Sequence, residues 1–225
     1  ESIDTERYRF DEWGNKDQEL KPLDDTTEQS GLVRAYDSHG QFLKDEATFF
    51  TDENGEPYAV RSQLTYDLTW SRIATIVDST VDKGGETIVP GELFEYAYDN
   101  HGRLKDVYYP SNVPNGPRDA QGKPSVSYEY KYNNPVTEMI VRHRSESGGD
   151  IDRTHVKCVD GFGRIFQERV SIGNGQFQVS GFMRRNPRGN VVEHYKPYLS
   201  DSAACEQSAP QDVLKITTTY DALSR

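Results

Sequence analysis

Aromatic and polar residues alternate with a period of two in several stretches of the chain. Residues 94–98 place Phe, Tyr and Tyr on one face of an extended strand and Glu and Ala on the other. Residues 126–132 repeat the pattern with Val and three tyrosines. The β-branched run at residues 73–77 predicts a buried strand. No amphipathic pattern with a helical period lasts more than two turns, so we expect an all-β chain.

Several of these stretches lead into four residues that begin with Asp and end with Gly. The carboxylate can accept backbone N–H bonds in a type I turn, and the glycine can adopt the positive φ that closes a hairpin. The motif occupies residues 11–14, 37–40, 52–55, 99–102 and 160–163. Its variants are Asn-Pro-Arg-Gly at residues 186–189, Asp-Ala-Leu-Ser at 221–224 and Asn-Asn-Pro at 133–135, and Gly-Asn-Gly at 173–175 is a further hairpin signal. We therefore expect consecutive antiparallel β-hairpins.

Composition narrows the possible partners. Only 34% of the 225 residues are hydrophobic, and the mean hydropathy is −0.84. The 14 tyrosines can bury their rings while their hydroxyl groups stay hydrated, which suits a thin sheet. With 37 acidic and 26 basic residues, the net charge of −11 would repel nucleic acid and anionic membranes. No apolar run approaches the roughly 18 residues of a membrane helix, so we expect neither nucleic-acid binding nor a membrane span.

Three segments share a sequence motif that is more specific than the residues of a turn alone. Residues 98–104 read Tyr-Asp-x-x-Gly-Arg-Leu, residues 160–164 read Asp-Gly-Phe-Gly-Arg, and residues 220–225 read Tyr-Asp-Ala-Leu-Ser-Arg. They resemble the YD, or RHS, repeats. Together with Asn-Pro-Arg-Gly-Asn at 186–190 and Tyr-Lys-Pro-Tyr-Leu-Ser-Asp at 195–201, their order is similar to the RHS region of the B component of insecticidal toxin complexes and related virulence-plasmid proteins.

The resemblance covers residues 94–225, whereas residues 1–93 are a less regular hairpin region that matches only at the level of repeat turns. It implies a β-sheet that spirals into a hollow shell around a toxic polypeptide until delivery. We therefore expect a secreted, non-enzymatic structural segment of a larger protein. Its partners would be the remaining segments of the same precursor or shell-forming subunit, and the enclosed toxin polypeptide. The structural repeat residues are Tyr96, Tyr98, Asp99, Gly102, Arg103, Tyr128, Tyr130, Asp160, Gly163, Arg164, Gly189, Tyr220 and Asp221.

Two other functions compete with this hypothesis. Exposed aromatic residues (Trp13, Trp70, Tyr108 and Tyr109) could bind a host-surface glycan or protein, as in adhesive YD-repeat proteins such as teneurins. The third possibility is an enzyme, but the five histidines are scattered along the chain and no zinc-binding sequence motif occurs. Each repeated Asp is already needed for its own turn, and the Asp-Pro-x-Gly segment at which related shells cleave themselves is missing. We expect no catalytic, metal or cofactor site.

Two features concern links between segments. Cys158 and Cys205 could form a disulfide or remain free, and we favour free thiols because nothing else indicates a disulfide scaffold. The β-branched residues of segment 213–219 predict a strand. Its hairpin return would follow Arg225, so its edge would be covered by a neighbouring repeat, by another chain of the same precursor or by self-association. Of these we expect another chain of the same precursor to continue the sheet there.

Overall fold

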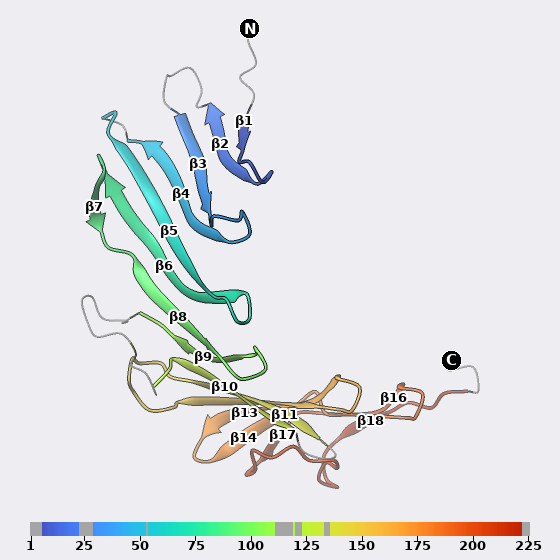
Figure 1. Ribbon diagram of the computed structural model, residues 1–225. Helices are drawn as coiled ribbons and strands as arrows, with labels where there is room; N and C mark the ends of the chain where they lie inside the picture. Colours follow the sequence, from blue (N-terminus) through green and yellow to red (C-terminus); the bar gives the residue numbers. More distant parts are fainter. Residues whose placement is uncertain are drawn as a thin grey trace. The chain divides into compact units, whose positions relative to one another are not determined.

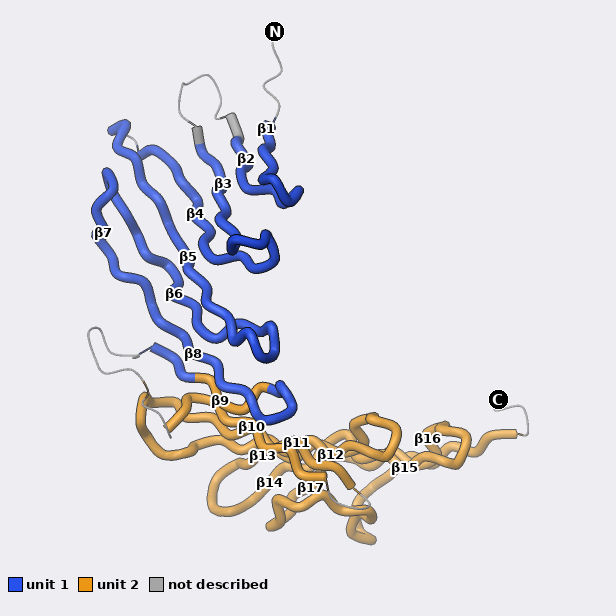
Figure 2. The backbone as a smooth tube through the Cα atoms, in the orientation of Figure 1, with its two compact units in different colours: residues 1–103, 108–110 blue, residues 104–107, 111–225 orange. Residues whose placement is uncertain are grey.

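The computed structural model describes residues 6–22, 29–52, 54–110, 119, 123–132 and 136–221. All regular structure within these ranges is β-strand (Figure 1). The chain divides into two compact units, the first made of residues 1–103 and 108–110 and the second of residues 104–107 and 111–225 (Figure 2). The predicted all-β class, with consecutive antiparallel hairpins, is confirmed.

The first unit is a single antiparallel sheet in which strands follow one another in sequence order. Its strands are β1 (Arg7–Phe10), β2 (Lys16–Pro22), β3 (Gln29–Tyr36), β4 (Leu43–Thr51), β5 (Pro57–Asp67), β6 (Arg72–Lys83), β7 (Glu86–Val89) and β8 (Glu92–Tyr98). The long strand β6 pairs with β7 near its end and with β8 near its middle. Consecutive hairpins produce such a meander directly, because each turn returns the chain beside the strand it has just left.

The second unit contains a larger and a smaller sheet. The larger sheet has the order β9 (Leu104–Tyr108, all but its last residue in this unit), β10 (Val126–Tyr132), β11 (Thr137–His143), β12 (Arg153–Val159), β13 (Ile165–Gly173), β14 (Gln176–Ser180) and β17 (Tyr198–Ser200). The smaller sheet has the order β15 (Met183–Arg185), β16 (Val191–Tyr195) and β18 (Lys215–Thr217). Of the strand expected over residues 213–219, only Lys215–Thr217 forms one, as β18, and it pairs with β16 of the same chain.

The first unit has no fully buried hydrophobic side chain among its described residues. Both faces of β5 and β6 are mostly half-buried, as in a sheet one layer thick. The run at residues 73–77 does form part of β6, but the expectation that it is buried is wrong. Within the described ranges no second layer covers it, so its β-branched side chains are shielded only by neighbours on the same face.

The second unit, in contrast, has a true core. Its buried cluster consists of Val136, Ile140, Val156, Cys158, Phe166, Phe182 and Tyr195. Residues 201–213, which we call the strap, run between β17 and β18 and contribute Cys205, Ala209 and Val213 to the rim of this cluster. The strap thus covers one face of the larger sheet and takes apolar side chains out of water.

Candidate functional site

Six turns in the described chain share one hydrogen-bonding pattern. In the turn that starts at Asp99, the Gly102 N–H donates to the Asp99 carbonyl at 2.9 Å, and the Asp99 N–H donates to the Arg103 carbonyl at 2.9 Å. Asp99 Oδ1 also accepts the N–H groups of His101 and Arg103. The turns at residues 11–14, 37–40, 52–55, 160–163 and 186–189 have the same bond from glycine to the first carbonyl, and all six glycines have positive φ. This is the type I turn with a glycine bulge that the spelling predicts.

The arginine after the turn glycine holds the turn carboxylate. Arg103 Nη2 lies 2.5 Å from Asp99 Oδ2, and the side-chain hydrogen bond from Arg103 is the largest cause that lowers the pKa of Asp99, to about 2. Arg164 forms the equivalent pair with Asp160 at 2.8 Å. Burial alone would raise the pKa of Asp160, but the bonds from the Arg164 backbone and side chain outweigh it and lower that pKa. The Asp-x-x-Gly-Arg spelling therefore describes an ion pair as well as a turn.

Tyrosine hydroxyl groups join successive repeats. Each of four hydroxyl groups donates to a backbone carbonyl: Tyr66 to Leu43 (2.9 Å), Tyr98 to Ile73 (2.7 Å), Tyr130 to Leu104 (3.1 Å) and Tyr220 to Val191 (3.1 Å). Each acceptor lies at the start of the strand that leaves the preceding turn. Three of the donors stand directly before an Asp, as in the Tyr-Asp spelling. The tyrosine thus acts as a rung between one hairpin and the next.

Tryptophan side chains pack on turn glycines in the first unit. A Cβ atom on Gly102 would lie 2.6 Å from Cε3 of Trp70, and a Cβ atom on Gly40 would collide with the Trp13 ring. Asn15 adds a side-chain bond to the Gly40 carbonyl at 2.8 Å. The tryptophan of one turn therefore rests on the glycine of the next, which gives these glycines a second reason to lack a side chain.

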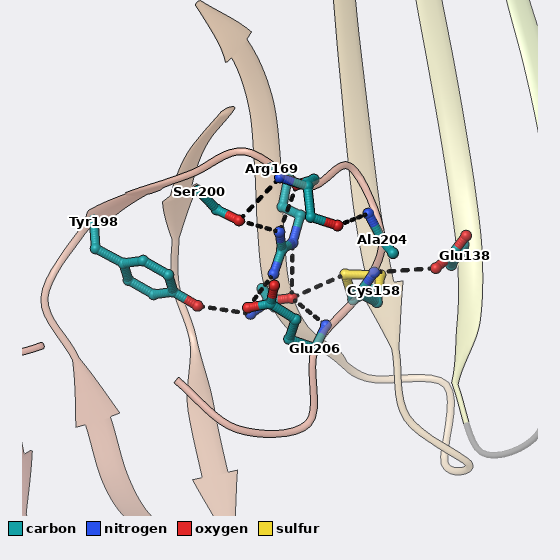
Figure 3. A network of polar contacts seen from close by, with 10 residues as sticks. Glu138, Cys158, Arg169, Tyr198, Ser200, Ala204 and Glu206 are labelled. Atoms are coloured by element: carbon teal, nitrogen blue, oxygen red, sulfur yellow. Dashed lines mark hydrogen bonds and ion pairs between the residues drawn. A yellow bond between two sulfur atoms is a disulfide. The ribbon is translucent and has the colours of Figure 1, made fainter. Parts of the chain in front are cut away.

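In the second unit, the largest fully buried side chain is that of Arg169, and Figure 3 shows its polar contacts. Arg169 is fully buried on β13, and its Nε donates to Gln167 Oε1 at 3.1 Å. Nη1 donates to Ser200 Oγ at 3.1 Å and to the Ser202 carbonyl at 2.7 Å. Nη2 lies 2.9 Å from Glu206 Oε2 as an ion pair without hydrogen-bond alignment. A buried cation thus has its counter-charge on the strap.

Backbone N–H groups of the strap also bond to side chains of the sheet beneath it. The Glu206 N–H donates to Gln167 Oε1 at 3.2 Å, and the Cys205 N–H donates to Glu138 Oε1 at 3.1 Å (Figure 3). Gln167 further donates to the Tyr198 hydroxyl at 3.4 Å. Burial, with a smaller effect of the Glu206 charge, raises the pKa of Tyr198. These bonds give polar partners to groups that the strap removes from solvent.

Cys158 and Cys205 form a disulfide that closes a sequence separation of 47 residues. The expectation of free thiols is therefore wrong. Cys158 lies on β12 and is fully buried, and the two Cα atoms are 5.7 Å apart. The Cys158 sulfur also lies 3.4 Å from Gln167 Oε1, but a disulfide sulfur has no hydrogen to donate, so this is a packing contact. The strap consequently has one covalent link to the sheet.

The remaining structural repeat residues have the following places in the structure. Tyr96 is on β8 and Tyr128 on β10, Gly163 has a φ of 79°, and Gly189 lies against the Arg164 guanidinium. Asp221 ends the described chain, and the predicted turn at residues 222–224 lies outside the described residues, as does that at 133–135. The described residues contain no helix long and apolar enough to cross a membrane, and no group of three or more His, Cys, Asp or Glu side chains placed to hold a metal.

Three of the four aromatic residues considered for adhesion have packing partners. Trp13 and Trp70 rest on turn glycines, and Tyr109 meets the ring of Phe94 edge to face at 5.8 Å. Trp13 and Trp70 therefore already have a structural role.

His39 and His101 lie in turns, where the His101 N–H donates to the turn carboxylate.

The comparisons with known proteins bear on the fold. No protein-family model matches the chain, and no curated protein matches its sequence. Among solved structures, the chain is similar to the crystal structure of TcdB2-TccC3, with a TM-score of 0.58 and 14% sequence identity. The match covers 94% of this chain and 12% of that chain, so this chain spans about an eighth of the length of its structural neighbour. At this identity the likeness establishes a shared fold.

Proposed function

We propose that this chain is a non-enzymatic wall segment of an RHS-type shell, which encloses a toxin or effector polypeptide before delivery. The observation that carries the proposal is the meander of hairpins with tyrosine rungs from one repeat to the next. The Tyr-Asp motif and the likeness of the fold to TcdB2-TccC3 support it.

A wall must be stable with water on both sides. The single-layer first unit suits this task, because its half-buried faces mix rings with ionised groups. Arg34 pairs with Glu46 across β3 and β4 at 2.7 Å, and Phe50 stacks on Tyr58 across β4 and β5 with ring centroids 5.6 Å apart. Cross-strand pairs of this kind stabilise a sheet without a second layer.

A wall must also extend by repetition. Each tyrosine rung bonds the backbone of the neighbouring repeat, so it depends on the fold and little on the identity of that repeat's side chains. Further hairpins can therefore add to the sheet with the same contacts, as in other repeat proteins whose stability comes from nearest neighbours.

The experiment is electron microscopy of the intact protein that contains this chain, combined with protease protection. We expect a hollow particle whose wall includes this segment, and an enclosed polypeptide that resists protease. The control is the same particle opened with denaturant, in which that polypeptide should be digested. A solid particle with this segment on an appended domain, or equal digestion in both samples, would refute the proposal.

A further inference from the structure

In the first unit, two turns each carry a tryptophan that fills the space beside the next turn. Trp13 is the third residue of its turn and rests on Gly40, whereas Trp70 rests on Gly102. The space between these neighbouring turns is therefore built to hold an indole ring. The chain itself supplies the ring at both places.

The second unit has a comparable pair of turns, at residues 160–163 and 186–189, but no tryptophan ring packs between them. Phe162 holds the third position that Trp13 holds in its turn, but its side chain is 83% exposed. The Arg164 guanidinium lies against Gly189 in place of a ring, 2.8 Å from where a Cβ atom would stand. A cavity of about 440 Å³ lies between these turns, lined in part by residues of both. We call it the inter-turn slot.

The walls of the inter-turn slot suit an aromatic group. Phe162, Phe166 and Met183 supply apolar and sulfur surface, and Arg164 and Arg185 supply two guanidinium groups. Arg164 already lies 4.9 Å from the centre of the Phe162 ring, so a cation–π contact exists at the rim. Guanidinium planes and methionine sulfur both bind aromatic rings favourably.

The slot also carries a net positive charge. Asp160 neutralises Arg164, but Arg185 has no carboxylate partner among the described residues. Its Nη1 donates to the Gly189 carbonyl at 2.9 Å, while its Nε is buried without a hydrogen-bond partner in the described chain. A ligand with a carboxylate next to its ring would complement both the ring site and the unpaired cation.

We propose that the inter-turn slot is a docking site for a partner polypeptide, which inserts a tryptophan or tyrosine side chain followed by an acidic residue. The inserted ring takes the place that Trp13 and Trp70 take in the first unit, with its edge on Phe166 and Met183. The acidic neighbour pairs with Arg185. The site is independent of whether the chain forms a shell wall.

Isothermal titration of the full chain tests the proposal with short blocked peptides. The probe carries tryptophan followed by aspartate, and the controls carry leucine followed by aspartate or tryptophan followed by asparagine. We expect saturable binding of the probe, about tenfold tighter than the leucine peptide because the ring and cation–π contacts are lost in that control. The asparagine peptide should be weaker as well, and Arg185→Met should abolish that difference.

Matched variants at the rim separate the slot from the rest of the surface. Gln207 lines the slot from the strap and is exposed, so Gln207→Trp should fill the slot within the chain and reduce probe binding. Ser208→Trp changes the next exposed residue, outside the slot, and should leave binding unchanged. The proposal fails if no probe saturates, if the leucine peptide binds equally, or if both variants behave alike. Equal binding of free indole and the peptide would indicate a small-molecule site and would also overturn it.

Discussion

The hydroxyl of Tyr98 donates a hydrogen bond to the backbone carbonyl of Ile73 at 2.7 Å, so the residue before one turn is tied to the strand that leaves the previous turn. The same bond, from a tyrosine hydroxyl to a carbonyl at the start of the strand that leaves the previous turn, recurs at Tyr66, Tyr130 and Tyr220. Because the acceptor is a main-chain atom, the bond fixes the register between neighbouring hairpins whatever side chain the acceptor residue carries.

Removal of one rung should loosen the sheet locally. Tyr98→Phe keeps the ring and leaves the Ile73 carbonyl without this donor, so we expect a loss of about 0.5–1.5 kcal/mol in the free energy of unfolding. The matched control is Tyr96→Phe, because the Tyr96 hydroxyl has no hydrogen-bond partner within the described chain. Urea unfolding of both variants measures the difference, and equal losses would contradict the rung.

The turn glycines separate two costs of adding a side chain. Gly102 and Gly163 have similar φ angles of 71° and 79°. A Cβ atom added at Gly102 would collide with Trp70, whereas one added at Gly163 would have no atom within 4 Å. Gly163→Ala should therefore cost about 1 kcal/mol for the positive φ alone. Gly102→Ala should cost more, because Trp70 must move as well. Urea unfolding of the two variants would show the order, and the reverse order would disprove the tryptophan contact.

The local parts of this architecture are readable from the sequence. Asp and Gly at a fixed offset specify the turn and its bulge, which is why 99–102 and 160–163 are predictable. The ion pairs of Asp99 with Arg103 and of Asp160 with Arg164 were not predicted and come from the structure. The tyrosine rungs are harder to predict. No sequence motif marks Ile73 as the acceptor, and the bond forms only if the strands pair in the right register. The available signal is the Tyr-Asp pair, which marks the donors Tyr66, Tyr98 and Tyr220 but not Tyr130.

The strap could not be predicted in this way. Its sequence is that of a polar connection, and the alternation in β13 gives no sign that Gln167 and Arg169 are both fully buried. Their burial depends on a segment more than thirty residues further along the chain, whose Ser202 carbonyl accepts a hydrogen bond from the guanidinium and whose Glu206 supplies the counter-charge. Cys158 and Cys205 pair for the same reason, because only the strap brings them together.

The Asp99 ion pair predicts a dependence of stability on acid. The pKa of Asp99 is lowered to about 2 in the folded chain, against about 3.9 for an unfolded aspartate. A lowered pKa means that the carboxylate stabilises the fold above about pH 4, and that this contribution is lost as the pH falls from about 4 to 2.

Asp99→Asn tests this contribution. Asn186 shows that an Asn in the first turn position still accepts the two backbone N–H bonds, so the variant keeps the turn and loses the pair with Arg103. We expect the variant to melt below the unaltered chain at pH 6, and the gap in melting temperature to close toward pH 2. A gap that stays constant across that range would argue against the ion pair.

The disulfide should matter most for the strap. A link across 47 residues removes chain entropy from the unfolded state worth about 4 kcal/mol in the loop-closure model. Replacing both cysteines, as Cys158→Ala with Cys205→Ala, should therefore lower the free energy of unfolding by up to about this amount. The replacement also leaves a small cavity at the buried Cys158 position, so the readout should be local as well as global.

Hydrogen exchange gives that local readout. In the double variant the backbone amides at positions 205 and 206 keep their acceptors on Glu138 and Gln167, but nothing covalent then holds the strap against the sheet. Residues 201–213 should exchange faster, while the amides of β11 and β12, which pair along seven residues each, should stay protected. Glu206→Gln is the companion variant, because it keeps the disulfide and removes only the counter-charge of Arg169. Faster exchange of the strap in the companion but not in the double variant would show that the ion pair, and not the disulfide, holds the strap in place.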